Sequence, residues 1–258
     1  MSKPVKRVLL TNDDGWRGPG LQVLEEIANA IAEEVWIVSP DLDQSGVSMS
    51  ISVHHPLRVH QFEERRFSVS GTPSDCVLLG VAELLPVKPD LVLSGVNNGA
   101  NISDSVAYSG TIGGALTGTL LGIPSIALSQ SQSFRERGSL PWDTARAWGS
   151  KAIKPLIEHG WPGDAVMNVN FPDVEPDEVK GIQITRQGFR DESIIHTDRR
   201  EDLRGNDYYW IGYKGKLSKP DAGTDLRAIY DGYVSISPLH VDLTHEVFLR
   251  TLRELWKT

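Results

Sequence analysis

The sequence predicts an α/β fold, with a doubly wound, mostly parallel β-sheet followed by β-hairpins and a closing helix. Three observations support this prediction. The first half of the chain alternates short β-branched runs with longer amphipathic segments, as βαβ units do. The strand-like runs end in turns that are rich in glycine, serine, asparagine and aspartate. Beyond Pro172 the pattern changes to short strand-like pieces that are separated by polar, glycine-rich loops.

The elements of the first part follow from hydrophobic spacing. Four apolar, β-branched runs are predicted as strands of the parallel sheet: residues 5–10, 35–38, 91–93 and 124–129. Segments with apolar residues at helical spacing are predicted as helices: residues 21–34, 74–85, 111–121 and 141–159. Pro155 should kink the last of these helices or end it early, because proline cannot donate the helical hydrogen bond.

The last part of the chain is predicted to have a different character. Its strand-like pieces are residues 182–186, 208–213 and 233–237, and residues 247–257 form an amphipathic helix with Thr244 as its N-cap. Projecting hairpins bury little surface by themselves, which predicts a partner surface and oligomerisation. We therefore divide the chain into an α/β core, residues 1–175, and a C-terminal oligomerisation extension, residues 176–258, which is not an independent domain.

Composition narrows the possible classes of function. The 258 residues contain 26 lysines and arginines against 34 aspartates and glutamates, and this net charge of −8 excludes the basic footprint of a protein that binds polymeric nucleic acid. The single cysteine, Cys76, allows no internal disulfide and no cysteine-cluster metal site, which fits a reducing cytoplasm. The apolar stretch 116–128 is broken by glycine and proline, and no targeting sequence is visible. We expect a cytoplasmic protein without a membrane span.

Two adjacent carboxylates, Asp13 and Asp14, follow the first predicted strand in the run TNDDG. Ligands bind at the carboxyl ends of the strands in an open parallel sheet, and two carboxylates there repel each other unless a positive charge lies between them. Oxygen donors favour hard cations, so the pattern predicts Mg²⁺, Mn²⁺ or Ca²⁺. The alternative interpretation is an Asx turn that caps the following helix.

Similar polar turns follow two other predicted strands. One contains Ser45 and the other contains Asn97, and we expect both at the same edge of the sheet as the aspartates. Each side chain can offer a neutral oxygen to the same cation, with water in the remaining positions. The alternative is turn chemistry alone, because loops use serine, asparagine and glycine in any case.

A third element is the run Ser109-Gly110-Thr111, in which hydroxyls and a glycine open a predicted helix. Free amides at a helix N-terminus bind phosphate groups, although such a run also serves as a simple cap. The chain has no P-loop, no H-E-x-x-H, no G-x-S-x-G and no G-x-G-x-x-G after a strand, so Walker-type, zincin, α/β-hydrolase and dinucleotide-binding chemistry lose their support. Cys76 is predicted to be buried rather than nucleophilic. Five arginines interleaved with carboxylates predict a solvated loop: Arg186, Arg190, Arg199, Arg200 and Arg204.

Ordered motifs extend over nearly the whole chain. They are LTNDDG at 10–15, SPD at 39–41, QSG at 44–46, GTPSDCV at 71–77, SGVN at 94–97 with Gly99 and Asn101, YSGT at 108–111, NVNFP at 168–172 and GYVSISPL at 232–239. In this set and order they resemble the SurE family of stationary-phase survival proteins, which are metal-dependent nucleotidases. So many ordered motifs make a chance resemblance improbable.

The resemblance implies a Rossmann-like three-layer core and a C-terminal extension that forms a homodimer or homotetramer. It implies one divalent cation, Mg²⁺ or Mn²⁺, per subunit, with the metal ligands Asp13, Asp14, Ser45 and Asn97. It implies phosphate binding by Asn101, Ser109, Gly110 and Thr111. The implied substrates are nucleoside monophosphates, which are hydrolysed to nucleoside and phosphate.

We therefore expect a metal-activated water to hydrolyse nucleoside 5′-monophosphates, and 3′-monophosphates as a second class, with Asp13 and Asp14 as catalytic residues. Two alternatives stay open. One is an aspartyl-phosphate phosphatase in which Asp13 is the nucleophile. The other is a metal-dependent nucleotide-binding or signalling protein without turnover. The sequence leaves open which aspartate acts on the water.

Overall fold

A nine-stranded sheet forms the centre of the computed structural model, which describes residues 3–132, 142–191, 195–213 and 217–256. The strand order is β3-β4-β2-β1-β5-β6-β7-β11-β8, and neighbours pair in parallel except β3 with β4 and β7 with β11. The strands are β1 (Val5–Thr11), β2 (Ala32–Pro40), β3 (Val59–Glu63), β4 (Arg66–Val69), β5 (Leu91–Asn98), β6 (Ser125–Gln130), β7 (Ala165–Phe171), β8 (Ile182–Ile184) and β11 (Val234–His240). The predicted mostly parallel α/β sheet is confirmed.

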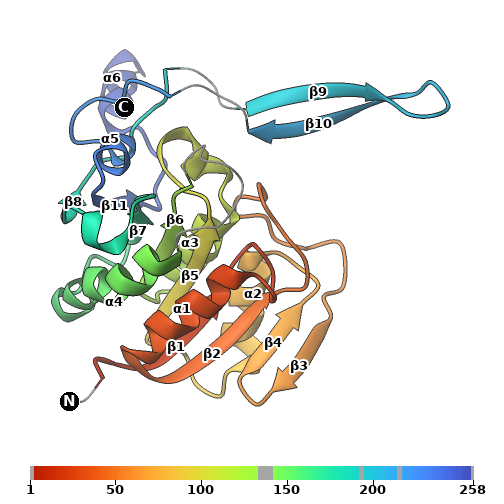
Figure 1. Ribbon diagram of the computed structural model, residues 1–258, viewed down its shortest axis with the longest axis vertical. Coiled ribbons are helices and arrows are strands. Elements are labelled where there is room, and N and C mark those ends of the chain that lie inside the picture. Colours follow the sequence, from red (N-terminus) through yellow and green to blue (C-terminus); the bar gives the residue numbers. More distant parts are fainter. Residues whose placement is uncertain (1–2, 133–141, 192–194, 214–216, 257–258) are drawn as a thin grey trace.

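Helices cover both faces of the sheet and so make three layers (Figure 1). α1 (Pro19–Asn29) and α4 (Trp142–His159) pack on one face, and α2 (Pro73–Leu79) and α3 (Gly110–Leu120) pack on the other. Alternate residues of β1 divide between the two cores, because Val8 and Leu10 join the cluster under α1 whereas Leu9 joins Cys76 under α2. The shorter elements are the π-helix η1 (Gly80–Leu84), the 3₁₀ helices η2 (Ser103–Tyr108) and η3 (Pro176–Glu178), and the helices α5 (Asp225–Tyr230) and α6 (Glu246–Trp256).

The C-terminal part contributes in two ways. β8 and β11 extend the main sheet, whereas β9 (Ile195–Glu201) and β10 (Asp207–Tyr213) form a separate antiparallel hairpin that projects from the body of the molecule (Figure 1). None of the described residues of α6 is buried, and Leu255 and Trp256 expose 68% and 70% of their surface. The described residues of the chain therefore leave much of the apolar face of this helix exposed. Among the described residues, no helix is long and apolar enough to cross a membrane.

Two predicted helices end earlier than expected. The first ends at Asn29 and not at Glu34, because residues 32–34 belong to β2, where Ala32 pairs with Val5 of β1. Sheet pairing therefore overrides a helical spacing that continues to Ile31. The helix predicted at 74–85 is α2 and ends at Leu79, followed by the π-helical turn η1.

The prediction that Pro155 could end the fourth helix early was wrong. α4 continues past Pro155 to His159, and the predicted first residue, Pro141, lies outside the described residues. The N-cap prediction for α6 was also wrong. The helix is capped by His245, whose Nδ1 accepts the amide hydrogen of Phe248 at 3.1 Å, while the amide of Thr244 donates to Asp242.

Several strands were not predicted. β3 is exposed along its whole length, so it shows no alternation of apolar and polar residues, and its partner β4 has only four residues. β7 and β9 were also missed. The solvated loop predicted for the arginines was wrong for Arg199 and Arg200, which lie on β9, where Arg199 bonds Asp207 of β10 at 2.6 Å. It was also wrong for Arg190, which is largely buried in an ion pair with Asp104.

Candidate functional site

Asp13 and Asp14 lie just beyond the carboxyl end of β1, in the loop that leads to α1. Asp13 is 4% exposed, and Asp14 is partly buried. Both oxygens of the Asp13 carboxylate accept hydrogen bonds from Thr111: the hydroxyl donates to Oδ1 at 2.6 Å and the amide donates to Oδ2 at 3.2 Å. The first predicted carboxylate therefore contacts the N-terminus of α3, where the phosphate-binding run was predicted.

Backbone hydrogen bonds bring two further loops to this pair. The amide of Gln44 donates to the carbonyl oxygen of Asp13 at 2.7 Å, and the amide of Asn98 donates to Asp14 Oδ2 at 3.1 Å. Because Ser45 follows Gln44 and Asn97 precedes Asn98, the loops that carry the two predicted neutral ligands converge on the aspartates. The Ser45 amide donates to Asp43, and the Asn97 carboxamide donates to the carbonyl oxygen of Gly99.

The electrostatic environment disfavours ionisation of both aspartates. Burial raises the pKa of Asp13 from its ordinary value of 3.8 to about 6, against the lowering effect of the Thr111 hydrogen bonds. Burial and then the negative charge of Asp13 raise the pKa of Asp14 to about 7, and Asp43 adds further repulsion to both. Among the described residues, the groups that lower these pKa values are hydrogen-bond donors and not cationic side chains. A cation bound between the two carboxylates would therefore offset a negative charge that the surrounding side chains leave uncompensated.

The donor chemistry fits a hard divalent cation. All four predicted ligands offer oxygen, and two of them are carboxylates. Within the described part of the chain, no cluster of three or more histidines, cysteines, aspartates or glutamates could hold a metal ion. A cation at this site would therefore depend on two carboxylates together with neutral oxygens. Glycine at position 110 lets the start of α3 approach Asp13 closely, because a Cβ atom there would lie 3.0 Å from the Cβ and 3.1 Å from Oδ2 of Asp13.

The predicted phosphate-binding run forms the N-terminal turn of α3. Ser109 is the N-cap, and its hydroxyl oxygen accepts the amide hydrogen of Ile112 at 3.1 Å. Gly110 and Thr111 are the first two residues of the helix, where amides have no carbonyl partner within the helix. Thr111 differs from the expectation in one respect, since its hydroxyl and its amide both donate to Asp13 in this structure.

Asn101 belongs to a buried network that sequence reasoning missed. Its carboxamide donates to Ser129 at 2.9 Å, and its amide donates to Asn170 Oδ1 at 2.9 Å. The side chain of Asn168 donates to its carbonyl oxygen at 2.8 Å. The NVNFP motif thus holds the loop that carries Asn101. The two-residue spacing of its asparagines on a strand puts both on one face of the sheet, a signal that could have found them.

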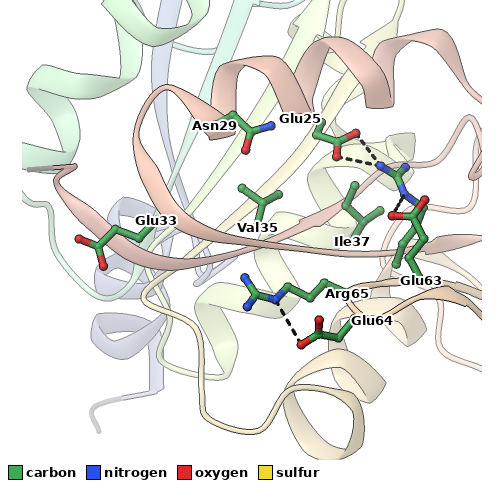
Figure 2. A pocket seen from close by; sticks show the side chains of 9 residues that line it. Glu25, Asn29, Glu33, Val35, Ile37, Glu63, Glu64 and Arg65 are labelled. Atoms are coloured by element: carbon green, nitrogen blue, oxygen red, sulfur yellow. Dashed lines mark hydrogen bonds and ion pairs between the residues drawn. The ribbon is translucent and has the colours of Figure 1, made fainter.

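A groove lies elsewhere, between α1, β2 and the turn that joins β3 to β4 (Figure 2). Val35 and Ile37 form its apolar part, and Arg66 bonds both oxygens of Glu25 across it, at 2.7 and 2.8 Å. Its lining is otherwise charged and polar: Glu25, Asn29, Glu33, Glu63, Glu64, Arg65 and Arg66. No predicted site residue lines this groove, so it does not belong to the aspartate site.

The family model described as Survival protein SurE matches residues 8–193. The chain belongs to the SurE family. The protein named 5'-nucleotidase SurE from Hyphomonas neptunium is 68% identical over 252 residues, which cover 98% of this chain and 100% of that protein. The protein of the same name from Caulobacter vibrioides is 53% identical over 249 residues, 96% of this chain and 95% of that protein.

A solved structure agrees with the family assignment. The crystal structure of the SurE protein from Aquifex aeolicus superposes with a TM-score of 0.82 at 37% sequence identity, and the match covers 96% of this chain and 99% of that chain. The resemblance drawn from the ordered motifs and the predicted fold class are therefore confirmed. The match extends beyond residue 193 into the C-terminal part, so these proteins share the extension as well as the core.

Proposed function

We propose that this protein is a 5′-nucleotidase, a metal-dependent phosphomonoesterase that hydrolyses nucleoside 5′-monophosphates to nucleoside and phosphate. Its relatives from H. neptunium and C. vibrioides carry that name and match nearly its full length. The observation that carries the proposal is the contact between the buried carboxylate of Asp13 and the N-terminus of α3 through Thr111. This contact puts cation-binding and phosphate-binding chemistry side by side.

We assign one divalent cation, Mg²⁺ or Mn²⁺, to each subunit, held by carboxylate oxygens of Asp13 and Asp14 and neutral oxygens of Ser45 and Asn97. The support is the donor set and the two desolvated carboxylates, whose pKa values are raised to about 6 and about 7. When bound, such a cation supplies Lewis acidity toward water and phosphoryl oxygens and offsets their negative charge.

The phosphoryl group of the substrate is assigned to the N-terminal turn of α3. The Ser109 hydroxyl accepts a hydrogen bond from Ile112 and still has its own proton to donate to a phosphate oxygen. The amide of Gly110 and the positive end of the helix dipole favour an anion at this turn, and Thr111, whose hydroxyl and amide both donate to Asp13, joins the phosphate site to the carboxylate. Asn101 completes this group from the preceding loop.

Asp14 is assigned to orient the attacking water and to accept its proton at Oδ1. Asp14 Oδ2 accepts the amide of Asn98, and both oxygens of Asp13 accept from Thr111. Among the described residues, Oδ1 of Asp14 is therefore the carboxylate oxygen of the pair without a hydrogen-bond donor. The same contacts weigh against Asp13 as the nucleophile of an aspartyl-phosphate phosphatase, because its oxygens are already engaged.

We further propose that the chain forms a homodimer or homotetramer through the extension, residues 176–258. The support is the exposed apolar surface of α6, with Leu255 and Trp256, and of the projecting hairpin, with Trp210 and Ile211. Exposed apolar surface of this kind marks protein–protein contacts. β8 and β11 complete the main sheet, which favours an extension that does not fold separately from the core, residues 1–175.

The test of the proposed function is phosphate release from a panel of nucleoside 5′- and 3′-monophosphates, in EDTA and after addition of Mg²⁺ or Mn²⁺. We expect phosphate release from 5′-monophosphates that disappears with EDTA and returns with metal. The 3′-monophosphates are tested as a second class of substrate. Asp14→Asn should abolish turnover in a folded protein. Binding of a nucleotide without any release would overturn the proposal in favour of a nucleotide-binding protein. Acid-stable labelling of Asp13 by substrate phosphate would favour the aspartyl-phosphate route.

A further inference from the structure

The residues on either side of the projecting hairpin contact the segment that precedes α3. Residues 187–190 and 224–225 flank the hairpin in the sequence, and an isolated parallel bridge joins Arg186 to Thr224 beside them. We call these six residues the hairpin base. One polar contact joins Gly188 to Asp225 within this base, and the others described below join the base to residues 102–104, which precede the phosphate-binding turn by only a few residues.

Asp225 provides the most buried of these contacts. Its side chain is fully buried and accepts the amide hydrogen of Ser103 at 2.8 Å, the Ser103 hydroxyl at 3.3 Å and the amide hydrogen of Gly188 at 2.9 Å. Gly188 leaves no room for a side chain, because a Cβ there would lie 3.0 Å from Thr224 Cβ and 3.2 Å from Ser103 Oγ. Residues from both segments of the hairpin base, Gly188 and Asp225, thus lie against Ser103.

Arg190 makes a second, separate attachment. Its guanidinium donates to Asp104 Oδ1 at 2.6 Å and to the carbonyl oxygen of Ile102 at 3.2 Å. The carboxamide of Gln187 donates to the carbonyl oxygen of Ser103 at 2.9 Å. Apolar packing adds to these bonds, since Ile102 is buried against Leu226 and Ile229 of α5. The hairpin base therefore fixes the start of η2 by polar and apolar contacts together.

The other end of η2 leads directly into the site. This 3₁₀ helix runs from Ser103 to Tyr108, and the next residue, Ser109, caps α3. A shift of η2 would therefore move Ser109 and the first turn of α3 relative to Asp13. We propose that Arg190 and Asp225 are positioning residues for phosphate binding, so that the C-terminal extension sets the affinity of the site for phosphate. The proposal rests on the assignment of phosphate to the α3 turn.

The chain offers a closely matched control for Arg190. The ion pair between Arg190 and Asp104 spans 2.6 Å, and its side chains are 11% and 32% exposed. The ion pair between Arg7 and Glu34 spans 2.7 Å with exposures of 12% and 27%, but it joins β1 to β2 near their amino ends, at the edge of the sheet opposite the site. Arg190→Met and Arg7→Met therefore remove equivalent ion pairs at two different places.

The first measurement is steady-state kinetics of the two full-length variants with a nucleoside 5′-monophosphate, together with inhibition by inorganic phosphate. We expect Arg190→Met to raise both KM and the inhibition constant of phosphate by about fivefold or more, with a smaller change in kcat. Arg7→Met should change neither constant by more than about twofold, and the two variants should lose similar stability. Arg190→Lys should restore part of the affinity, because an ammonium can still donate to Asp104.

The second measurement does not depend on turnover. Hydrogen–deuterium exchange should increase in residues 101–112 of Arg190→Met and not in Arg7→Met, and calorimetric titration with inorganic phosphate should show the weaker binding directly. Equal exchange in both variants, or unchanged phosphate affinity in a folded Arg190→Met protein, overturns the proposal. If Arg190→Met does not fold, Asp104→Asn serves in its place. Wild-type protein that releases no phosphate would refute the proposed function, while the exchange and titration results would still decide this inference.

Discussion

The substitution Asp14→Asn should stabilise the metal-free protein while it abolishes activity. In the folded chain the pKa of Asp14 is raised from 3.8 to about 7, chiefly by burial and then by the charge of Asp13. At about 1.4 kcal/mol per pKa unit, ionisation of this carboxyl disfavours the folded state by about 4 kcal/mol at high pH. Asparagine has the same shape and no charge, and its carbonyl oxygen can still accept the amide of Asn98.

The sign of the pH dependence follows from the direction of this pKa change. Between the unfolded pKa of 3.8 and the folded pKa of about 7, the folded protein binds more protons than the unfolded chain, so its stability falls as the pH rises. The penalty from Asp14 is roughly 2 kcal/mol at pH 5 and reaches its full value of about 4 kcal/mol above pH 7. The stability gained by Asp14→Asn should therefore be larger at pH 8 than at pH 5.

The assay is urea denaturation in EDTA at pH 5 and pH 8, for the wild type, Asp14→Asn and the control Asp177→Asn. Asp177 is exposed on η3, so its substitution removes one negative charge without relieving a buried carboxylate. Addition of Mn²⁺ should raise the unfolding midpoint of the wild type and the control but not that of Asp14→Asn, since only a cation-binding site gains from the ion. An Asp14→Asn protein that is no more stable than the wild type at pH 8, or whose gain is equal at both pH values, would refute this reasoning.

Three further results are expected. Gly110→Ala should lower kcat by at least about tenfold, because the new Cβ would lie 3.0 Å from Asp13 Cβ; the same contact should lower the urea midpoint, and activity of the folded variant at saturating metal tests the loss. Asn170→Ala should lower the free energy of unfolding by about 2–3 kcal/mol, because it leaves the amide of Asn101 buried without an acceptor; a change below half of that would contradict the network. Leu255→Glu, on the exposed face of α6, should leave the chain folded but reduce its mass in light scattering to that of a monomer, and an unchanged mass would place the interface elsewhere.

The sequence predicted the fold best where local patterns and tertiary structure agree. The buried strands β1, β5 and β6 have β-branched or aliphatic runs, and all were expected. Pairing with a distant strand decided the boundaries that were wrong. Ala32 fits the helical spacing before it, yet it pairs with Val5, and β3 has no buried residue that would mark it as a strand. Such pairings depend on contacts between segments far apart in the chain.

For the candidate site, too, the sequence predicted some features and not others. Residue types and their places after strands pointed to Asp13, Asp14 and the α3 turn, because the carboxyl ends of parallel strands meet at one edge. Hydrogen-bond partners were not predictable from those patterns. That both donors of Thr111 are directed to Asp13, and that Asn170 holds Asn101, are consequences of how α3 and β7 pack against the sheet.

The contact with α3 also explains why the two aspartates are not equivalent. Asp13 is the more buried of the pair, and burial alone would give it the higher pKa, yet its pKa is raised to about 6 and that of Asp14 to about 7. Asp13 receives two hydrogen bonds from Thr111 at the positive end of α3, whereas Asp14 receives one from Asn98 and faces the charge of Asp13. The helix therefore favours Asp13 as the ionised, cation-holding carboxylate. Asp14, which has one carboxylate oxygen without a hydrogen-bond donor among the described residues, is the better suited of the two to accept the proton of a water.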